Sequence, residues 1–114
     1  MPSRWDIVDV DFGTPVGHEQ AKVRPAVIVS HDGLNHNADL ATVCPITSAR
    51  TVAKYPSEVE IPTLPGILAA GVLMGQQIRT ISISMRVKGV RGPLADPVLR
   101  RRVYEAIAAL VPPP

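Results

Sequence analysis

A chain of 114 residues with 46% hydrophobic side chains can build one hydrophobic core without a disulfide or a metal, so we predict a single domain over residues 1–114. Aromatic residues make up only 4% of the chain, which argues against a protein that stacks successive bases on Phe and Tyr. The single cysteine, Cys44, excludes an internal disulfide, and the sequence shows neither a signal peptide nor a run able to span a bilayer, so we expect a cytoplasmic protein without membrane contact.

The net charge of +2 is distributed unevenly along the chain. Residues 1–78 carry 5 basic and 8 acidic side chains, whereas residues 79–114 carry 7 and 2. This asymmetry favours a nucleic-acid partner, an acidic protein partner, or both. The high apolar content also indicates that a second chain covers part of the surface, so we expect an oligomer.

The first predicted strand covers residues 5–12. Apolar and acidic side chains alternate along it in the pattern of a half-buried strand, at Val8, Asp9, Val10, Asp11 and Phe12. The two aspartates on one face could bind magnesium, but exposed carboxylates at this spacing are usually only solvated. We therefore predict no metal site.

The second predicted strand covers residues 26–29, a short β-branched run typical of a strand buried on both faces. Pro25 disfavours the helical region for the residue before it, so we expect Arg24 to be extended at the start of this strand. An imidazole, a carboxylate, an amide, an ammonium and a guanidinium lie within residues 18–24. Such a group can handle a phosphate and a proton, although a solvated surface turn would have a similar composition.

The rest of the chain reads as short strands followed by one helix. A polar turn is predicted at residues 31–37, and strands at 40–47, 59–61, 72–74, 77–81 and 87–90; Pro45 indicates a bulge or an edge strand. Asp96-Pro97 is typical of a helix start, and apolar residues then recur at helical spacing to Leu110. We therefore predict a mainly β domain with α structure (α+β), a small β-barrel or curled sheet with a C-terminal α-helix.

Several segments, in this order, resemble the MazF/PemK family, the toxins of bacterial toxin–antitoxin pairs: Asp11 to Gly13, Gly17 to Gln20, Arg24 to Ser30, Pro45 to Ser48, Tyr55-Pro56, and Gln77 to Thr80 before a closing helix. The resemblance implies an SH3-like β-barrel that forms a homodimer. It also implies a sequence-selective endoribonuclease that cuts single-stranded RNA without metal or cofactor, leaving a 2′,3′-cyclic phosphate and a 5′-hydroxyl, and an antitoxin partner that occupies the RNA groove.

The resemblance also assigns residues to roles. The family's catalytic arginine falls on Arg24 and its catalytic threonine on Thr47. The loop before the arginine belongs to the family's RNA-binding site. We expect RNA contacts from Gln20, Lys22, Ser48, Gln77 and Arg79.

Elementary chemistry agrees with the two catalytic assignments. The planar guanidinium of Arg24 can donate two hydrogen bonds to a phosphate, but it stays protonated at neutral pH and is therefore a poor base. The hydroxyl of Thr47 can donate to the same phosphate oxygens. For proton transfer the candidates are His18, because imidazole titrates near neutral pH, and Glu19, because burial can raise the pKa of a carboxyl group. The sequence does not choose between them.

The remaining candidate residues indicate no second reaction or metal site. His31 and His36 have neither metal-ligand nor triad spacing, and Cys44 is expected to be buried and inert. Ser30 and Ser48 lack a nucleophile motif. The cluster at Arg100, Arg101 and Arg102 is expected to be a solvated face or a contact with RNA or an acidic partner.

Two differences from the family pattern leave the last strand and the RNA sequence preference open. Gln76 stands where an acidic residue often precedes the glutamine, and the segment after Thr80 resembles the family least. A non-catalytic toxin of the same barrel class that poisons DNA gyrase, or an SH3-like binding module, are the competing interpretations, because fold alone does not decide function. Only the ribonuclease requires the pair of Arg24 and Thr47.

Overall fold

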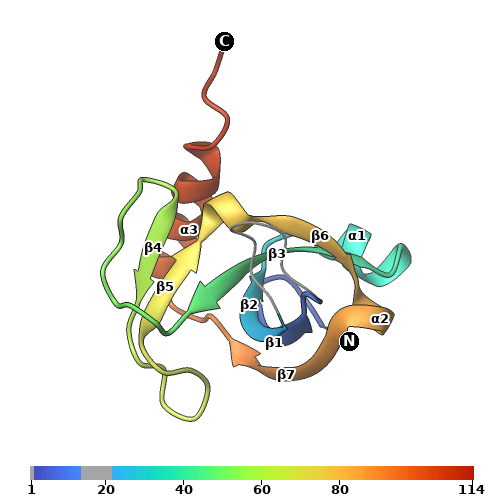
Figure 1. Ribbon diagram of the computed structural model, residues 1–114. Coiled ribbons are helices and arrows are strands. Elements are labelled where there is room, and N and C mark those ends of the chain that lie inside the picture. The colour runs from blue at the N-terminus through green and yellow to red at the C-terminus, as the bar shows by residue number, and fades with distance from the viewer. Residues whose placement is uncertain (1, 14–21) are drawn as a thin grey trace.

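A computed structural model of the chain describes residues 2–13 and 22–114. Within these residues, seven strands form one sheet that curls around itself, with the C-terminal helix packed beside it (Figure 1). The elements in chain order are β1 (Asp6–Asp11), β2 (Val23–Ile28), α1 (Asp32–Asn37), β3 (Leu40–Thr47), β4 (Glu58–Ile61), β5 (Gly71–Met74), η1 (Gly75–Gln77, a 3₁₀ turn), β6 (Arg79–Ser82), α2 (Ile83–Arg86), β7 (Val87–Pro93) and α3 (Pro97–Ala108). The α+β prediction is confirmed.

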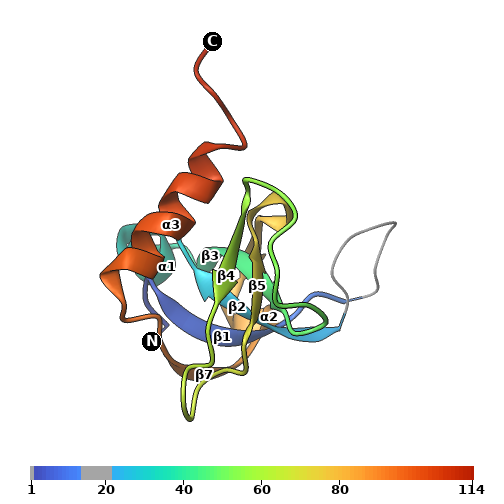
Figure 2. The ribbon, with the colours of Figure 1, turned by 90° about the vertical axis from the view of Figure 1, so that its left-hand side faces the viewer.

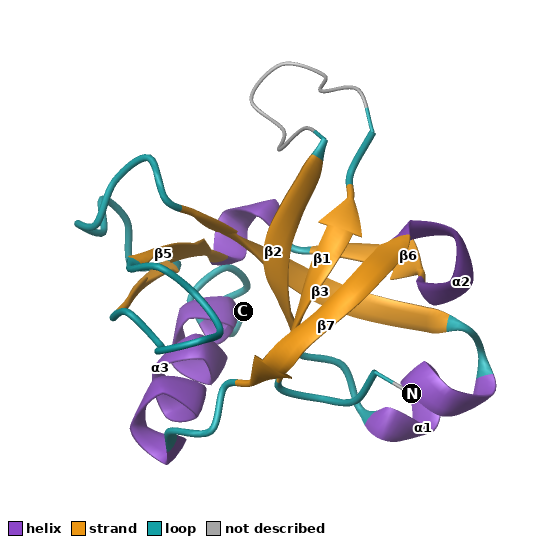
Figure 3. Cartoon of the chain, turned by 90° about the horizontal axis from the view of Figure 1, so that it is seen from below, coloured by secondary structure: helices purple, strands orange, loops and turns teal. Residues whose placement is uncertain are grey.

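The strands follow the order β4-β5-β3-β2-β1-β7, with β6 paired to β3, and neighbouring strands are antiparallel. Figure 3 shows the long β3 crossing behind β2, β1 and β7. In the described part of the chain, the end strands β4 and β7 do not pair with each other, so the sheet is curled but not closed. The predicted SH3-like barrel is therefore a barrel only in the loose sense.

Strand β3 has the bounds that the sequence predicted, and it organises the sheet. Along one edge it pairs with β6 from Leu40 to Val43 and then with β5 at Ile46 and Thr47. Pro45 lies between these two ladders, where its missing N–H costs no ladder bond on that edge. The prediction of a bulge or an edge strand at Pro45 was therefore wrong. Pro45 lies in a central strand, at the point where β3 changes its pairing partner from β6 to β5.

Both faces of β2 are buried from Ala26 to Ile28, which confirms the predicted buried strand, although β2 begins earlier, at Val23, and ends before Val29. On one face a cluster that includes Ile7, Val27 and Cys44 packs under α3. On the other face Val8 and Ile28 belong to a second cluster. Because neighbouring side chains of a strand point to opposite faces, β1 and β2 contribute to both clusters and are held firmly in place.

Three short elements differ from the predictions. The predicted turn at 31–37 contains α1, which begins at an N-cap where His31 Nδ1 accepts a hydrogen bond from the Gly33 amide at 2.8 Å. The predicted strand at 77–81 begins only at Arg79, because Gly75–Gln77 form the 3₁₀ turn η1. Helix α2 was not predicted; it has four residues, too few to give a periodic pattern.

Helix α3 is confirmed, with Asp96 as its N-cap accepting from the Val98 amide at 2.8 Å. Its buried residues, Leu99, Val103 and Ala106, face β4 and η1. Figure 2 shows α3 on one side of the molecule and the adjoining ends of β1 and β2 on the other. No helix within residues 2–13 and 22–114 is long and apolar enough to cross a membrane.

Candidate active site at the open end of β1 and β2

Arg24 lies where β1 ends and β2 begins. Its Cα partner in β1 is Val10, and its side chain is exposed. Because Arg24 is paired with β1 and β2 continues into its pairing with β3 at Ala26, the backbone of Arg24 belongs to a strand and not to a loop. The prediction that Arg24 is extended at the start of a buried strand is confirmed.

Thr47 ends β3 on the neighbouring strand. The antiparallel register of β2 and β3 pairs Val27 with Cys44 and then Ala26 with Pro45. Two residues further along each strand are Arg24 and Thr47. Because side chains alternate between faces, these two residues lie on the same face of the sheet as the Ala26–Pro45 pair, at the same end.

The hydroxyl of Thr47 is oriented by its own loop. Its Oγ1 accepts a hydrogen bond from the Ala49 amide at 3.2 Å, so the hydroxyl hydrogen remains available as a donor. Thr47 is half-buried, and Ser48, which follows it, is exposed. The end of β3 therefore presents two neighbouring hydroxyl groups, one of them oriented.

Two further arginines reach the end of β1 from β6 and α2. Arg79 Nη1 donates to the carbonyl oxygen of Phe12 at 3.3 Å, and its guanidinium lies 5.7 Å from the centre of the Phe12 ring. Arg86 Nη1 donates to the carbonyl oxygen of Asp11, also at 3.3 Å. Arg79 was a predicted RNA contact, whereas Arg86 was not, because the sequence gives no sign that α2 turns back toward β1.

Backbone hydrogen bonds fix the two residues on either side of segment 14–21. The Phe12 amide donates to the Lys22 carbonyl at 2.9 Å, and the Lys22 amide donates to the Gly13 carbonyl at 2.8 Å. Gly13 has a φ of 75°, a conformation that suits glycine. The predicted residues His18, Glu19 and Gln20 lie outside the described residues.

We call the four basic side chains at this end of the sheet, Lys22, Arg24, Arg79 and Arg86, the cationic end. Arg79 and Arg86 contact the last residues of β1 with their side chains, and the backbones of Lys22 and Arg24 lie beside those residues. Gln77, another predicted RNA contact, closes η1 two residues before Arg79. A group of cations beside two hydroxyls is able to bind a polyanion and to hold one of its phosphodiester groups.

The carboxylates proposed as an alternative metal site have other partners. Asp9 forms an ion pair with Arg91 at 3.0 Å, and Asp11 accepts from the Gly13 amide at 2.8 Å. Among the residues that the structure describes, no group of three or more His, Cys, Asp and Glu is placed to hold a metal ion. Asp9 and Asp11 therefore act in local structure.

The other candidate residues that the sequence offered, His31, His36, Cys44 and Ser30, have structural roles. His31 caps the start of α1, and His36 lies beside Asp32 within that helix. Cys44 is buried, and burial raises the pKa of its thiol to about 12, which confirms the inert thiol that the sequence predicted. Ser30 Oγ donates to Asn35 and accepts from the Thr42 amide.

Residues 3–111 match the protein family described as PemK-like, MazF-like toxin of type II toxin-antitoxin system. The chain belongs to this family. The match confirms the resemblance seen in the sequence, and it spans every element from β1 to α3.

Two curated relatives are named as endoribonucleases. The chain is 33% identical to the endoribonuclease toxin MazF of Escherichia coli K12 over 101 residues, which is 88% of this chain and 86% of that protein. It is 37% identical to endoribonuclease EndoA of Bacillus subtilis over 79 residues, 68% of each chain.

Solved MazF structures from Deinococcus radiodurans have the same fold. One crystal structure of that MazF is 27% identical, has a TM-score of 0.79 and covers 96% of both chains. A MazE–MazF crystal structure from the same organism contains a chain that is 28% identical, with a TM-score of 0.72, covering 96% of this chain and 95% of that one. The MazF-like fold of this chain, with its curled sheet and C-terminal helix, agrees with these structures.

Proposed function

We propose that this chain is a sequence-selective endoribonuclease toxin that cuts single-stranded RNA without a metal ion, leaving a 2′,3′-cyclic phosphate and a 5′-hydroxyl. Membership of the toxin family and two relatives named as endoribonucleases support the activity. The observation that carries the proposal is the register of β2 and β3, which brings Arg24 and Thr47 to one end and one face of the sheet.

In this reaction the 2′-hydroxyl of the RNA attacks the neighbouring phosphate, the bond to the 5′-oxygen breaks, and charge builds on the phosphate oxygens. Arg24 supplies the donors for that charge, because its guanidinium stays protonated and matches two phosphate oxygens at once. Thr47 adds a third donor from the adjacent strand. Donors held in place before the reaction stabilise such a transition state strongly.

A proton must leave the 2′-hydroxyl and another must reach the 5′-oxygen. His18 and Glu19 remain our candidates for these two transfers. Lys22, Ser48, Gln77 and Arg79 would hold the RNA on either side of the cleaved bond, with Gln20. Arg86 joins this set because it extends the cationic end.

The proposed partners follow from the relatives and from the substrate. We infer that a cognate antitoxin neutralises the chain, because a related MazF was crystallised with MazE. Two copies would form a homodimer, which agrees with exposed apolar side chains such as Val90 and Met85. The cytoplasm is the compartment that holds the RNA substrate.

Cleavage in the presence of EDTA tests the activity. The purified chain, incubated with a long RNA in excess EDTA, should cut at a short recurring sequence, and mapping the ends should find cyclic phosphate on one side and hydroxyl on the other. If EDTA abolishes cutting, the reaction uses a metal and the proposal is wrong. If no RNA is cut with or without EDTA, the gyrase poison or the binding module replaces it.

Arg24→Ala tests the residue that carries the mechanism. Loss of its donors should lower the cleavage rate by about 100-fold to 1,000-fold, with far-UV circular dichroism and oligomeric state unchanged. Arg101→Ala is the matched control, since it removes the same charge from an exposed position on α3, away from the cationic end (Figure 2). Wild-type activity in the Arg24 variant would remove Arg24 from the reaction.

A further inference from the structure

The side chain of Glu58, at the start of β4, is fully buried although it carries a charge. Its Oε2 accepts from Arg50 Nη2 and, at 2.6 Å, from Gln76 Nε2. Its Oε1 accepts from the Lys54 amide at 2.8 Å. We call Glu58 with Arg50 and Gln76 the Glu58 network.

The network compensates the cost of burying the carboxylate. Burial by itself raises the pKa of Glu58, but the hydrogen bonds from Arg50, from the Lys54 amide and from Gln76 outweigh it and lower the pKa to about 2. Glu58 is therefore ionised at neutral pH, with each oxygen hydrogen-bonded. A buried charge of this kind fixes the geometry of its donors, because moving any of them leaves the carboxylate unsatisfied.

Two of the three donors, Arg50 and the Lys54 amide, come from the segment that follows Thr47. Strands β3 and β4 are both antiparallel to β5, which lies between them, so β3 and β4 are parallel. The connection over residues 48–57 therefore has to return along the sheet, and it does so without helix or strand. Arg50 and Lys54 belong to this connection, and Glu58 ends it.

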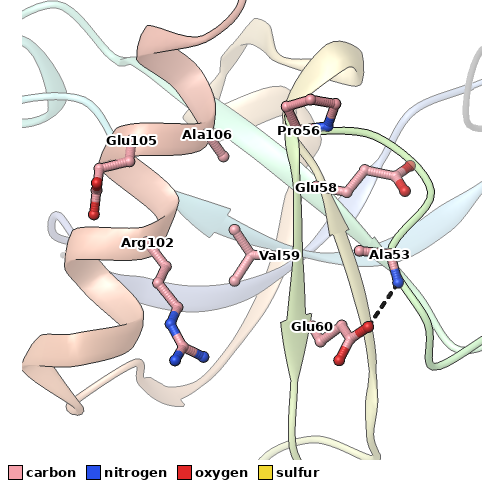
Figure 4. Close-up of a pocket in the computed structure, with 8 residues that line it drawn as sticks. All are labelled: Ala53, Pro56, Glu58, Val59, Glu60, Arg102, Glu105 and Ala106. Atoms are coloured by element: carbon pink, nitrogen blue, oxygen red, sulfur yellow. Dashed lines mark hydrogen bonds between the residues drawn. The ribbon is translucent and has the colours of Figure 1, made fainter.

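Figure 4 shows how β4 holds the connection. Glu58 points away from α3 toward the segment that carries Ala53, and Glu60 accepts from the Ala53 amide at 2.9 Å. Arg50 adds a second tie, because its Nη1 donates to the carbonyl oxygen of Val52 at 2.8 Å while Nη2 holds Glu58. The guanidinium of Arg50 thus connects the turn after Thr47 and Ser48 to the carboxylate of Glu58.

Gln76 connects the same carboxylate to the other side of the candidate active site. It lies in η1, next to Gln77 and three residues before Arg79. Its Oε1 accepts from Ser57 Oγ at 2.9 Å, and the Gly75 amide donates to the Ser57 carbonyl at 2.8 Å. The position of η1 is therefore tied to the start of β4 by both backbone and side chain.

We propose that Glu58 is a positioning residue for RNA cleavage, which through Arg50 sets the place of the Thr47 hydroxyl and through Gln76 that of the Gln77 turn. This inference rests on the proposed ribonuclease function. Glu58 itself touches no substrate, since its side chain is buried. Its effect on the reaction depends on geometry, and a shift of about 1 Å in a donor can cost about 100-fold in rate.

Glu58→Gln tests the inference because it keeps the shape and removes the charge that Arg50 binds. At a temperature where both proteins are folded, single-turnover cleavage should slow by about 10-fold to 100-fold, with KM for the RNA changed far less. The methyl signal of Thr47 in a ¹³C-methyl-threonine spectrum should shift or broaden. Glu105→Gln, which changes an exposed carboxylate on α3 outside the Glu58 network, is the matched control and should change neither.

Arg50→Lys and Arg50→Ala separate positioning from stability. Lysine keeps a cation beside Glu58 but lacks the second nitrogen with which Arg50 binds the Val52 carbonyl, so the cleavage rate should fall in the order wild type, Arg50→Lys, Arg50→Ala. This pair also carries the test if Glu58→Gln does not fold. A folded Glu58 variant with the wild-type rate and an unchanged Thr47 signal would overturn the inference. If wild-type protein cut no RNA, the function would fail, while the Thr47 signal would still decide whether Glu58 positions it.

Discussion

At the scale of single residues, the hydroxyl of Thr47 is the group whose role can be isolated most cleanly. Valine has the same shape, so Thr47→Val removes the donor and the acceptor without leaving a cavity. If the hydroxyl donates to the phosphate in the transition state, cleavage should slow by about 100-fold to 1,000-fold while RNA binding is nearly unchanged. Single-turnover rates with saturating RNA measure this directly.

Thr47→Ser supplies the control, since it keeps the oxygen that accepts from the Ala49 amide. Its rate should stay within about 10-fold of the wild type, well above that of the valine variant. Equal rates in Thr47→Val and wild type would show that the threonine is only structural and that Arg24 acts without it.

The resemblance to the family could assign Arg24 and Thr47 because the motifs that carry them, Arg24-Pro25 and Pro45-Ile46-Thr47, are short and local. The sequence could not predict that Glu58 is buried. In the alternation of β4, Glu58 and Glu60 read alike as outward-facing residues. Only the connection over residues 48–57, which covers one carboxylate and not the other, makes them different. Arg86 escaped notice for the same reason, because its contact with β1 is long-range.

At the scale of elements, the start of α3 offers a test of stability separate from activity. Asp96 accepts from the Val98 amide, which has no partner within the helix, and Pro97 follows at the first helical position. Asp96→Ala should lower the free energy of unfolding by about 1 kcal/mol, measured by urea denaturation, and leave the cleavage rate unchanged. Asp96→Asn should restore most of the loss. An equal loss in the asparagine variant would mean that the charge of Asp96, and not its cap, is what stabilises α3.

The elements that the sequence predicted well are those whose pattern is long or strongly marked. Strand β3 is a long, mostly apolar run that ends at two hydroxyl residues, and helix α3 has a clear helical period that begins at Asp96-Pro97. Helix α1 was read as a turn because its residues include Gly33, Asn35 and Asn37, which favour turns. It forms because Asn35 is buried and donates to the Ser30 carbonyl at 2.9 Å, a contact that depends on the fold around it.

At the scale of the whole molecule, the two hydrophobic clusters hold different sets of elements together. The cluster under α3 joins the helix to β4 and β5, and the cluster on the other face joins β1, β2, β3 and β6. The cationic end lies at the rim of this second cluster, where Phe12 meets Arg79. Because β1 and β2 are packed on both faces, the strands that lead to these cations are held in place.

The buried Glu58 makes the stability of the whole domain depend on acid. Its folded-state pKa of about 2 lies below the ordinary value of 4.5, so the ionised form stabilises the fold at neutral pH, and this contribution is lost as the pH falls from about 5 to about 2. The loss should be on the order of 3 kcal/mol. Urea denaturation of wild type and Glu58→Gln, repeated at steps of pH, should therefore show a difference that is largest near neutral pH and shrinks toward about pH 2.

The comparison with the glutamine variant removes the effects of the other carboxyl groups, because those are present in both proteins. Asp32 and Asp39 also have lowered pKa values, from hydrogen bonds with Arg4 and Asn35 and with Ser84 and Ser82, and they add acid sensitivity that the two proteins share. A difference that stayed constant from neutral pH to acid would mean that Glu58 has the same pKa in the folded and the unfolded state. The Glu58 network would then not stabilise the ionised carboxylate, and Arg50 would not act as its counter-ion.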